Sequence, residues 1–122
     1  MMPPESRDPA YLWDMLEAAK RILEFTRQTT FEQYARNEMM QSAVERQLEI
    51  IGEAARRVSD TFKAAHPEIP WQPMIAQRNI LAHEYGEVLD DRVWATVADD
   101  LPRLVSILGP LIPPLPPGSR KP

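Results

Sequence analysis

The feature that most constrains the fold is a stretch between residues 38 and 63 in which apolar side chains recur every three or four residues. This spacing places them on one stripe of an α-helix, with the intervening charged residues on the opposite side. We therefore expect a long amphipathic helix over about residues 38–63, and other helices must cover its stripe. The stripe consists of Met40, Val44, Leu48, Ile51, Ala55, Val58 and Phe62.

The segment before this helix carries helix-start signals. A first helix is expected over about residues 9–27, with Asp8 as its N-cap. Thr30 and Gln33 have the spacing of a capping box and open a short helical turn. Asn37 then caps the long helix.

Two more helices are expected after the long one. The first covers about residues 71–85, and the second begins at Asp90 or Asp91 and ends near residue 108. Pro102 lies inside the last helix and should kink it. Four principal helices without strand signals predict an all-α, up-and-down four-helix bundle.

The bundle is expected to occupy residues 9–108 as one domain, with a loose N-terminal end at residues 1–8. Residues 109–122 form a proline-rich tail that cannot stay helical. The chain has no cysteine, which excludes disulfides and thiolate metal sites and fits a reducing cytoplasm. No apolar run reaches the roughly 20 residues of a membrane span, and no signal-peptide layout opens the chain.

The net charge of −4 and the pI near 5.2 argue against broad, nonspecific binding to nucleic acid. A nucleic-acid ligand would therefore need positive charge gathered at one place on the surface. The candidate catalytic residues gather in one short stretch. It is WQPMIAQRNILAHEYG, residues 71–86, in which Arg78 and Asn79 precede His83 and Tyr85 in an R-N-x3-H-x-Y pattern.

This stretch resembles the Rx4-6H signature of HEPN domains, in which Asn, Asp or His commonly follows the arginine. The added Tyr85 resembles the HepT branch, the toxin half of HepT/MNT toxin–antitoxin pairs. Residues 43–59, AVERQLEIIGEAARRVS, and residues 93–105, VWATVADDLPRLV, also look like that branch. The resemblance covers roughly residues 8–108 and implies a ribonuclease that acts as a dimer.

The chemistry of such a ribonuclease suits the residue types of the motif. Without a metal, the RNA's own 2'-hydroxyl attacks the phosphodiester, and a base that titrates near neutral pH must take its proton. His83 fits that role, Arg78 would hold the phosphate and its developing charge, and Asn79 would orient the imidazole or donate to a phosphate oxygen. We expect no metal and no cofactor.

Helical geometry separates the side chains of Arg78 and His83. A spacing of five residues along a helix turns their directions apart by about 140°. Two such helices facing each other across a two-fold axis could bring the functional side chains into one cleft. We therefore expect a homodimer. Ala43, Gln47, Ile50 and Ala54 broaden the apolar face of the long helix and form a candidate dimer surface, or else another helix of the same chain covers them.

The family resemblance also implies a role for Tyr85. In the HepT branch, the MNT antitoxin is a nucleotidyltransferase that transfers AMP from ATP to the tyrosine of this motif. ATP would therefore be used by the partner and not by this chain. The added AMP would block RNA by its bulk and its negative charge.

The polar face of the long helix offers further candidates. Arg46 and Arg57 could hold phosphates, with Glu49 or Glu53 positioning Arg78. Alternatively, these residues form ordinary ion pairs within the helix, such as Arg46–Glu49 and Glu53–Arg57, and this reading is favoured.

Two other functions stay open. The chain could be a non-catalytic HEPN module that binds a nucleotide or a nucleotidyltransferase partner and regulates it. It could also be a purely structural bundle that forms dimers. The second histidine, His66, is expected to be a loop residue rather than a metal ligand.

Overall fold

The computed structural model describes residues 7–83 and 87–112, without the side chains of residues 78–80, 82–83 and 87–89. Over these residues the chain is helical and has no strand, which confirms the all-α prediction. The helices are α1 (Asp8–Phe25), α2 (Phe31–Ala35), α3 (Glu38–Arg57), α4 (Asp60–Ala65), α5 (Trp71–His83), α6 (Glu87–Ala95) and α7 (Leu101–Leu108), with the π-helix η2 (Thr96–Asp100) and the 3-10 turn η3 (Gly109–Leu111).

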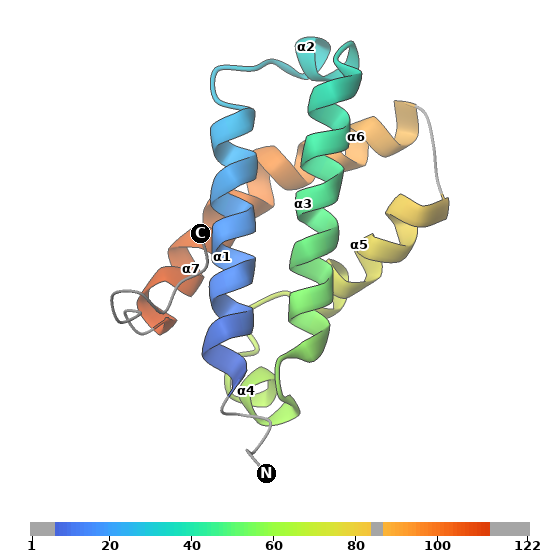
Figure 1. Cartoon of the computed structure of the whole chain (residues 1–122). Coiled ribbons are helices and arrows are strands. Elements are labelled where there is room, and N and C mark those ends of the chain that lie inside the picture. Colours follow the sequence, from blue (N-terminus) through green and yellow to red (C-terminus); the bar gives the residue numbers. More distant parts are fainter. Residues whose placement is uncertain (1–6, 84–86, 113–122) are drawn as a thin grey trace.

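The two longest helices, α1 and α3, lie side by side and run in opposite directions (Figure 1). Helix α5 packs on α3, α7 packs on α1, and the short α2 lies at one end of the molecule against α3 and α6. One apolar core joins these helices, because each turns its apolar stripe inward. Its fully buried side chains include Leu12, Met15, Ile22, Tyr34, Val44, Ile69, Val93 and Leu108.

The start of α1 differs from the prediction. Asp8 is the first residue of the helix and Arg7 stands at the N-cap position, where it makes no side-chain capping bond. The Asp8 carboxylate is only 4% exposed and instead accepts two hydrogen bonds from Ser59, from the backbone N–H at 2.9 Å and from the hydroxyl at 2.6 Å. Asp8 therefore ties the start of α1 to a residue 51 positions away.

The expected long helix is two helices. Helix α3 ends at Arg57, Val58 is extended with φ −63° and ψ 143°, and α4 begins at Asp60. The Ser59 hydroxyl accepts a hydrogen bond from the Phe62 N–H at 3.1 Å and so caps α4. Because Ser59 is held by Asp8 at the same time, the continuous helix gives way to a break at this point.

The capping predictions around α2 are confirmed. The Thr30 hydroxyl accepts from the Gln33 N–H at 3.1 Å, and the Gln33 side chain accepts from the Thr30 N–H at 2.9 Å. The Asn37 side chain accepts from the Met40 N–H at 3.0 Å and opens α3. Between α1 and α2, Gln28 has a left-handed backbone with φ 58°.

The last predicted helix is also divided. It begins at Glu87, earlier than Asp90 or Asp91, and its middle turn, η2, is a π-helix directly before α7. Pro102 lies in the first turn of α7, lacks an N–H, and would press its ring on a carbonyl one turn earlier in a regular helix. The wider turn of η2 accommodates this, so the expected distortion takes the form of a π-helix. Within the described ranges, no helix has both the length and the apolar character that crossing a membrane requires.

Candidate functional site

Helix α5 carries the backbone of the R-N-x3-H pattern. Arg78, Asn79 and His83 lie in about its last two turns, and His83 is its final residue. Their side chains are not among those that the structure describes, and Tyr85 lies outside the described residues altogether. The positions of these groups on the helix are therefore known, while the contacts between them stay predictions.

The start of α5 is anchored to the core. Ile69 and Trp71 are buried, and the Trp71 indole N–H donates to the His66 carbonyl oxygen at 3.0 Å. The Phe62 ring meets the Trp71 ring edge-on at 6.1 Å between centroids. These contacts fix the direction in which the helix leaves the turn before it.

The middle of α5 is joined to the π-helix. The Gln77 side-chain amide donates to the Thr96 hydroxyl at 3.1 Å, and that hydroxyl donates to the Arg92 carbonyl oxygen at 3.1 Å. Leu81, one turn after Gln77, is buried in the core. The motif therefore stands on a helix held at its start and at its middle, as a site that needs fixed geometry requires.

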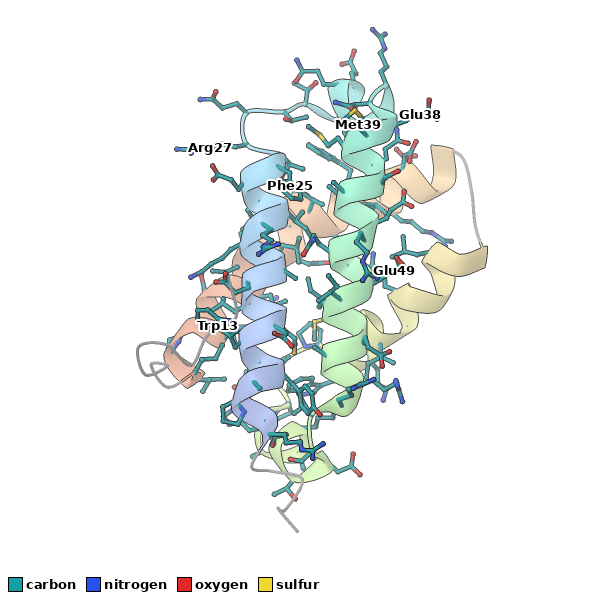
Figure 2. The ribbon with its side chains drawn as sticks, in the orientation of Figure 1. Trp13, Phe25, Arg27, Glu38, Met39 and Glu49 are labelled. Carbon is teal, nitrogen blue, oxygen red and sulfur yellow. The ribbon has the colours of Figure 1, made fainter. Side chains whose placement is uncertain are left out.

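The three candidate residues of α3 surround one surface hollow. Arg46, Glu49 and Glu53 line a depression of about 410 Å³ between α1 and α3. Figure 2 shows Glu49 projecting from the middle of α3. The rest of the lining is Tyr11, Asp14, Ile50, Ala54 and Arg57.

Ion pairs form within α3, which bears on the choice between phosphate contacts and ordinary intrahelical pairs for its charged residues. Glu53 bonds to Arg56 at 2.7 Å and to Arg57 at 3.1 Å, which confirms the predicted Glu53–Arg57 pair. The Glu53 contact also raises the pKa of Arg56, mainly through the hydrogen bond. No ion pair joins Arg46 to Glu49 among the described residues, so the exposed Arg46 guanidinium is open to an anion.

The candidate dimer surface is only partly covered by the chain. Ala54 is buried, whereas Ala43, Gln47 and Ile50 are half-exposed. Coverage by the same chain, the alternative to a dimer surface, is therefore complete at Ala54 and partial at Ile50, which packs against the core.

His66 occupies the turn after α4, as predicted. Its Nδ1 lies 3.0 Å from a carboxylate oxygen of Glu68. A hydrogen bond to its own backbone, followed by the contact with His66, lowers the pKa of the Glu68 carboxyl. Over the described part of the chain, no group of three or more His, Cys, Asp or Glu side chains could hold a metal ion.

Another hollow, of about 550 Å³, lies between α5 and α7. Its described lining is mostly apolar, and Arg103 at the rim is its one cation. Such a surface does not suit a polyanion, since phosphate binding relies on several cationic or N–H donors.

A junction of α2, α3 and α6 is not predicted by the sequence. Tyr34 is fully buried, and its ring lies 5.3 Å from the Trp94 ring of α6. The Gln41 side chain of α3 donates to the Tyr34 carbonyl oxygen at 2.9 Å. Glu45 follows Gln41 by one turn, and Asp90 precedes Trp94 by one turn, so both residues lie on the helix faces that adjoin Tyr34.

The electrostatics of this junction are unfavourable for the charged forms. Burial, and then the nearby Glu45 and Asp90 carboxylates, raise the pKa of the Tyr34 hydroxyl. Burial, Asp90 and Glu49 raise the pKa of the Glu45 carboxyl. The sequence signal that could have found the junction is the i, i+4 spacing of Gln41 with Glu45 and of Asp90 with Trp94.

Comparison with known proteins identifies relatives over most of the chain. The profile of a family described as ribonuclease HepT-like matches residues 15–110. A Thermococcus cleftensis protein, provisionally named ribonuclease HepT, is 46% identical over 94 residues, which are 77% of this chain and 86% of the relative. A Methanocaldococcus jannaschii protein, provisionally named an RNase, is 39% identical over 95 residues, which are 78% of this chain and 87% of the relative. No solved structure matches.

Proposed function

Because the chain belongs to the ribonuclease HepT-like family, we propose that it is a metal-independent endoribonuclease and the toxin of a HepT/MNT toxin–antitoxin pair. The family match over residues 15–110 carries this proposal. The placement of Arg78, Asn79 and His83 on one well-anchored helix supports it. The unit that acts would be residues 9–108, folded as an up-and-down bundle whose principal arms are α1, α3, α5 and the run from α6 to α7.

The proposed reaction uses the RNA as its own nucleophile. His83 takes the proton from a 2'-hydroxyl, whose oxygen attacks the adjacent phosphorus. The bond to the 5'-oxygen breaks, that oxygen receives a proton, and a 2',3'-cyclic phosphate remains. Arg78 stabilises the charge that builds on the phosphate oxygens, and Asn79 orients the imidazole.

We propose that the active form is a homodimer in which two α5 helices face one cleft. The half-exposed side chains of Ala43, Gln47 and Ile50 support a contact along α3. The charged hollow next to them would then extend the cleft. Arg46 would bind a phosphate of the RNA, and Glu49 and Glu53 would position the catalytic arginine.

Mixing two inactive variants tests the shared cleft. If each site takes His83 from one protomer and Arg78 from the other, a heterodimer of Arg78→Ala and His83→Ala contains one intact site. Equal mixing after subunit exchange should restore about a quarter of the wild-type rate, because about half of the dimers are mixed and each has one of two sites. A mixture as inactive as its components would rule out sites shared in this way.

Tyr85 is proposed as the point of control. An MNT-type nucleotidyltransferase would join its phenol oxygen to the α-phosphorus of ATP, releasing pyrophosphate while a base takes the phenol proton. Intact-mass spectra after co-expression with such a partner should show added AMP, and Tyr85→Phe should show none. Tyr34→Phe is the matched control, because that hydroxyl is buried and should not be modified.

Product analysis tests the proposed cleavage chemistry. Purified chain should cut RNA in the presence of EDTA and leave 2',3'-cyclic phosphate ends. An RNA in which every 2'-hydroxyl is methylated should stay intact, because its nucleophile is missing. Cleavage of that RNA, or products with 5'-phosphate ends, would contradict the proposal.

A second candidate function is a non-catalytic module that binds and regulates a nucleotidyltransferase. The net charge of −4 and the acidic junction around Tyr34 favour protein partners over RNA. This function predicts a stable complex with the partner. It also predicts that RNA is cleaved neither by the chain alone nor by the complex.

A further inference from the structure

A chain of two hydrogen bonds joins the motif helix to the helix that follows it. The Gln77 side-chain amide donates to the Thr96 hydroxyl at 3.1 Å, and this hydroxyl donates to the Arg92 carbonyl oxygen at 3.1 Å. A hydroxyl has one hydrogen to give, so its bond to the carbonyl leaves only lone pairs for Gln77. This relay therefore runs from the amide of α5 through Thr96 to the backbone of α6.

The relay encloses the R-N-x3-H pattern. Gln77 directly precedes Arg78, and Thr96 follows Gln77 by 19 positions, so residues 78–95 lie inside the loop that the bond closes. Figure 1 shows that α5 and α6 both extend past one side of α3. The bond between Gln77 and Thr96 therefore ties the two arms of this part of the chain to each other.

The relay fixes the rotation of α5 about its axis more firmly than apolar packing does. The buried Leu81 and the half-buried Ile75 hold α5 against the core, but burial of apolar surface is non-directional. A hydrogen bond weakens steeply when its angle changes. Because each residue is turned by about 100° from the one before it, a fixed direction for Gln77 also fixes where Arg78 and His83 stand around the helix.

The π-helix η2 belongs to the same arrangement. Thr96 is its first residue, and the Thr96 carbonyl oxygen accepts from the Leu101 N–H, five positions later. Thr96 therefore closes the wide turn with its backbone and bonds to α5 with its side chain. Short π-helical turns are frequent at functional sites, and this one meets the motif helix.

We propose that Gln77 and Thr96 are positioning residues, which hold α5 in the rotation that brings Arg78 and His83 to the RNA. The inference rests on the proposed ribonuclease activity and adds to it two residues that act through the motif. A displacement of about 1 Å at the reacting groups can lower a rate by about 100-fold. Loss of one bond in the relay loosens the alignment only in part, so the expected loss of rate is about tenfold.

Steady-state cleavage of one RNA by the full chain tests this role. Thr96→Val replaces the hydroxyl by a methyl group and should lower kcat by about tenfold while KM changes by less than about twofold. Thr96→Ser keeps a hydroxyl and should retain kcat within about twofold of wild type. Gln77→Leu should match Thr96→Val, and the double variant should lose no more than either, since both changes remove one bond.

Thr26→Val is the matched control. The Thr26 hydroxyl also donates to a carbonyl four residues earlier, that of Ile22 at 2.8 Å, but it stands at the C-cap of α1. Its loss should lower stability and leave kcat unchanged. An equal fall in kcat for Thr26→Val and Thr96→Val would overturn the positioning role, because it would show a general loosening of the fold.

Amide hydrogen exchange separates failure of this inference from failure of the proposed function. In Thr96→Val, the amides of residues 78–83 should exchange at least about fivefold faster than in wild type, while those of α1 keep their rates. Unchanged exchange at residues 78–83, or faster exchange with an unchanged kcat, overturns the positioning role. A wild-type chain that cleaves no RNA, with faster exchange in Thr96→Val, overturns the ribonuclease function and not the hold of the relay on α5.

Discussion

The polar side chains at the two ends of the molecule differ in whether they are hydrogen-bonded. At the end where α1 starts and α3 stops, the Asp8 carboxylate accepts from the Ser59 N–H and hydroxyl, and Ser59 in turn caps α4. At the other end, the Tyr34 hydroxyl and the Glu45 carboxylate find no partner among the described residues. Figure 1 shows α4 and α2 at these opposite ends.

This difference separates a region whose polar groups stabilise the fold from one whose polar groups weaken it. A buried carboxylate with two short hydrogen bonds joins distant parts of the chain and strengthens the folded state. A buried hydroxyl without a partner, next to carboxylates that repel one another, weakens the folded state. Substitutions at the two ends should therefore shift stability in opposite directions.

The largest effect is expected at the first end. Asp8→Ala should lower the free energy of unfolding by about 1–3 kcal/mol, because the part-buried Ser59 N–H and hydroxyl lose their charged acceptor. Urea denaturation followed by circular dichroism measures this change. Asp99→Ala, at an exposed position, is the control and should change stability by less than about 0.5 kcal/mol. Equal effects would mean that the Asp8–Ser59 contact does not stabilise the fold.

A smaller effect of opposite sign is expected for Tyr34→Phe. Removing a buried hydroxyl without a partner should raise the free energy of unfolding by about 0.5–1 kcal/mol. Tyr11→Phe, at a half-exposed position, should be nearly neutral in the same denaturation experiment. A loss of more than 1 kcal/mol for Tyr34→Phe would show, by the scale of a typical hydrogen bond, that the hydroxyl has a partner in solution.

The smallest effect concerns the charge of Glu45. Its pKa is raised in the fold from the usual 4.5, so the folded state favours the protonated carboxyl. Its stabilising contribution is complete below the unfolded pKa and is lost as the pH rises through the raised folded pKa. Glu45→Gln should therefore be more stable than wild type at pH 7, by about 0.5 kcal/mol or less since water screens this half-exposed group.

The pH dependence sharpens this prediction. The stability difference between Glu45→Gln and wild type should disappear as the pH falls below about 4, where both states carry the proton. Thermal melts across pH 3.5–7 measure it. A variant that is less stable than wild type at pH 7 would show that the Glu45 charge has a favourable partner.

Local signals in the sequence were sufficient for some elements and insufficient for others. The caps at Thr30 and Asn37 were predictable because each bonds to a residue only three positions away. The break after Arg57 was not, because its cause is Asp8, far away in the sequence. The apolar periodicity of a segment predicts a helix but carries no information about contacts with residues elsewhere in the chain.

The candidate site shows the same limit. The sequence was sufficient to place the motif residues on one helix and Arg46, Glu49 and Glu53 on the polar face of another. The Tyr34 junction combines α2, α3 and α6, and only their packing brings those side chains together. The form of the distortion near Pro102 likewise depended on packing, since Thr96 in η2 bonds to Gln77 of α5.

The two histidines give the most direct test of the ribonuclease assignment, because only one of them lies in the R-N-x3-H pattern. His66 stands at the C-cap of α4 and pairs with Glu68, whereas His83 is the last residue of α5. RNA cleavage should be measured for His83→Ala and His66→Ala under the same conditions. We expect His83→Ala to lose about 100-fold or more of the rate, as removal of a general base does, and His66→Ala to cleave within about twofold of wild type. Equal rates for the two variants would contradict the assignment of His83 as the catalytic base.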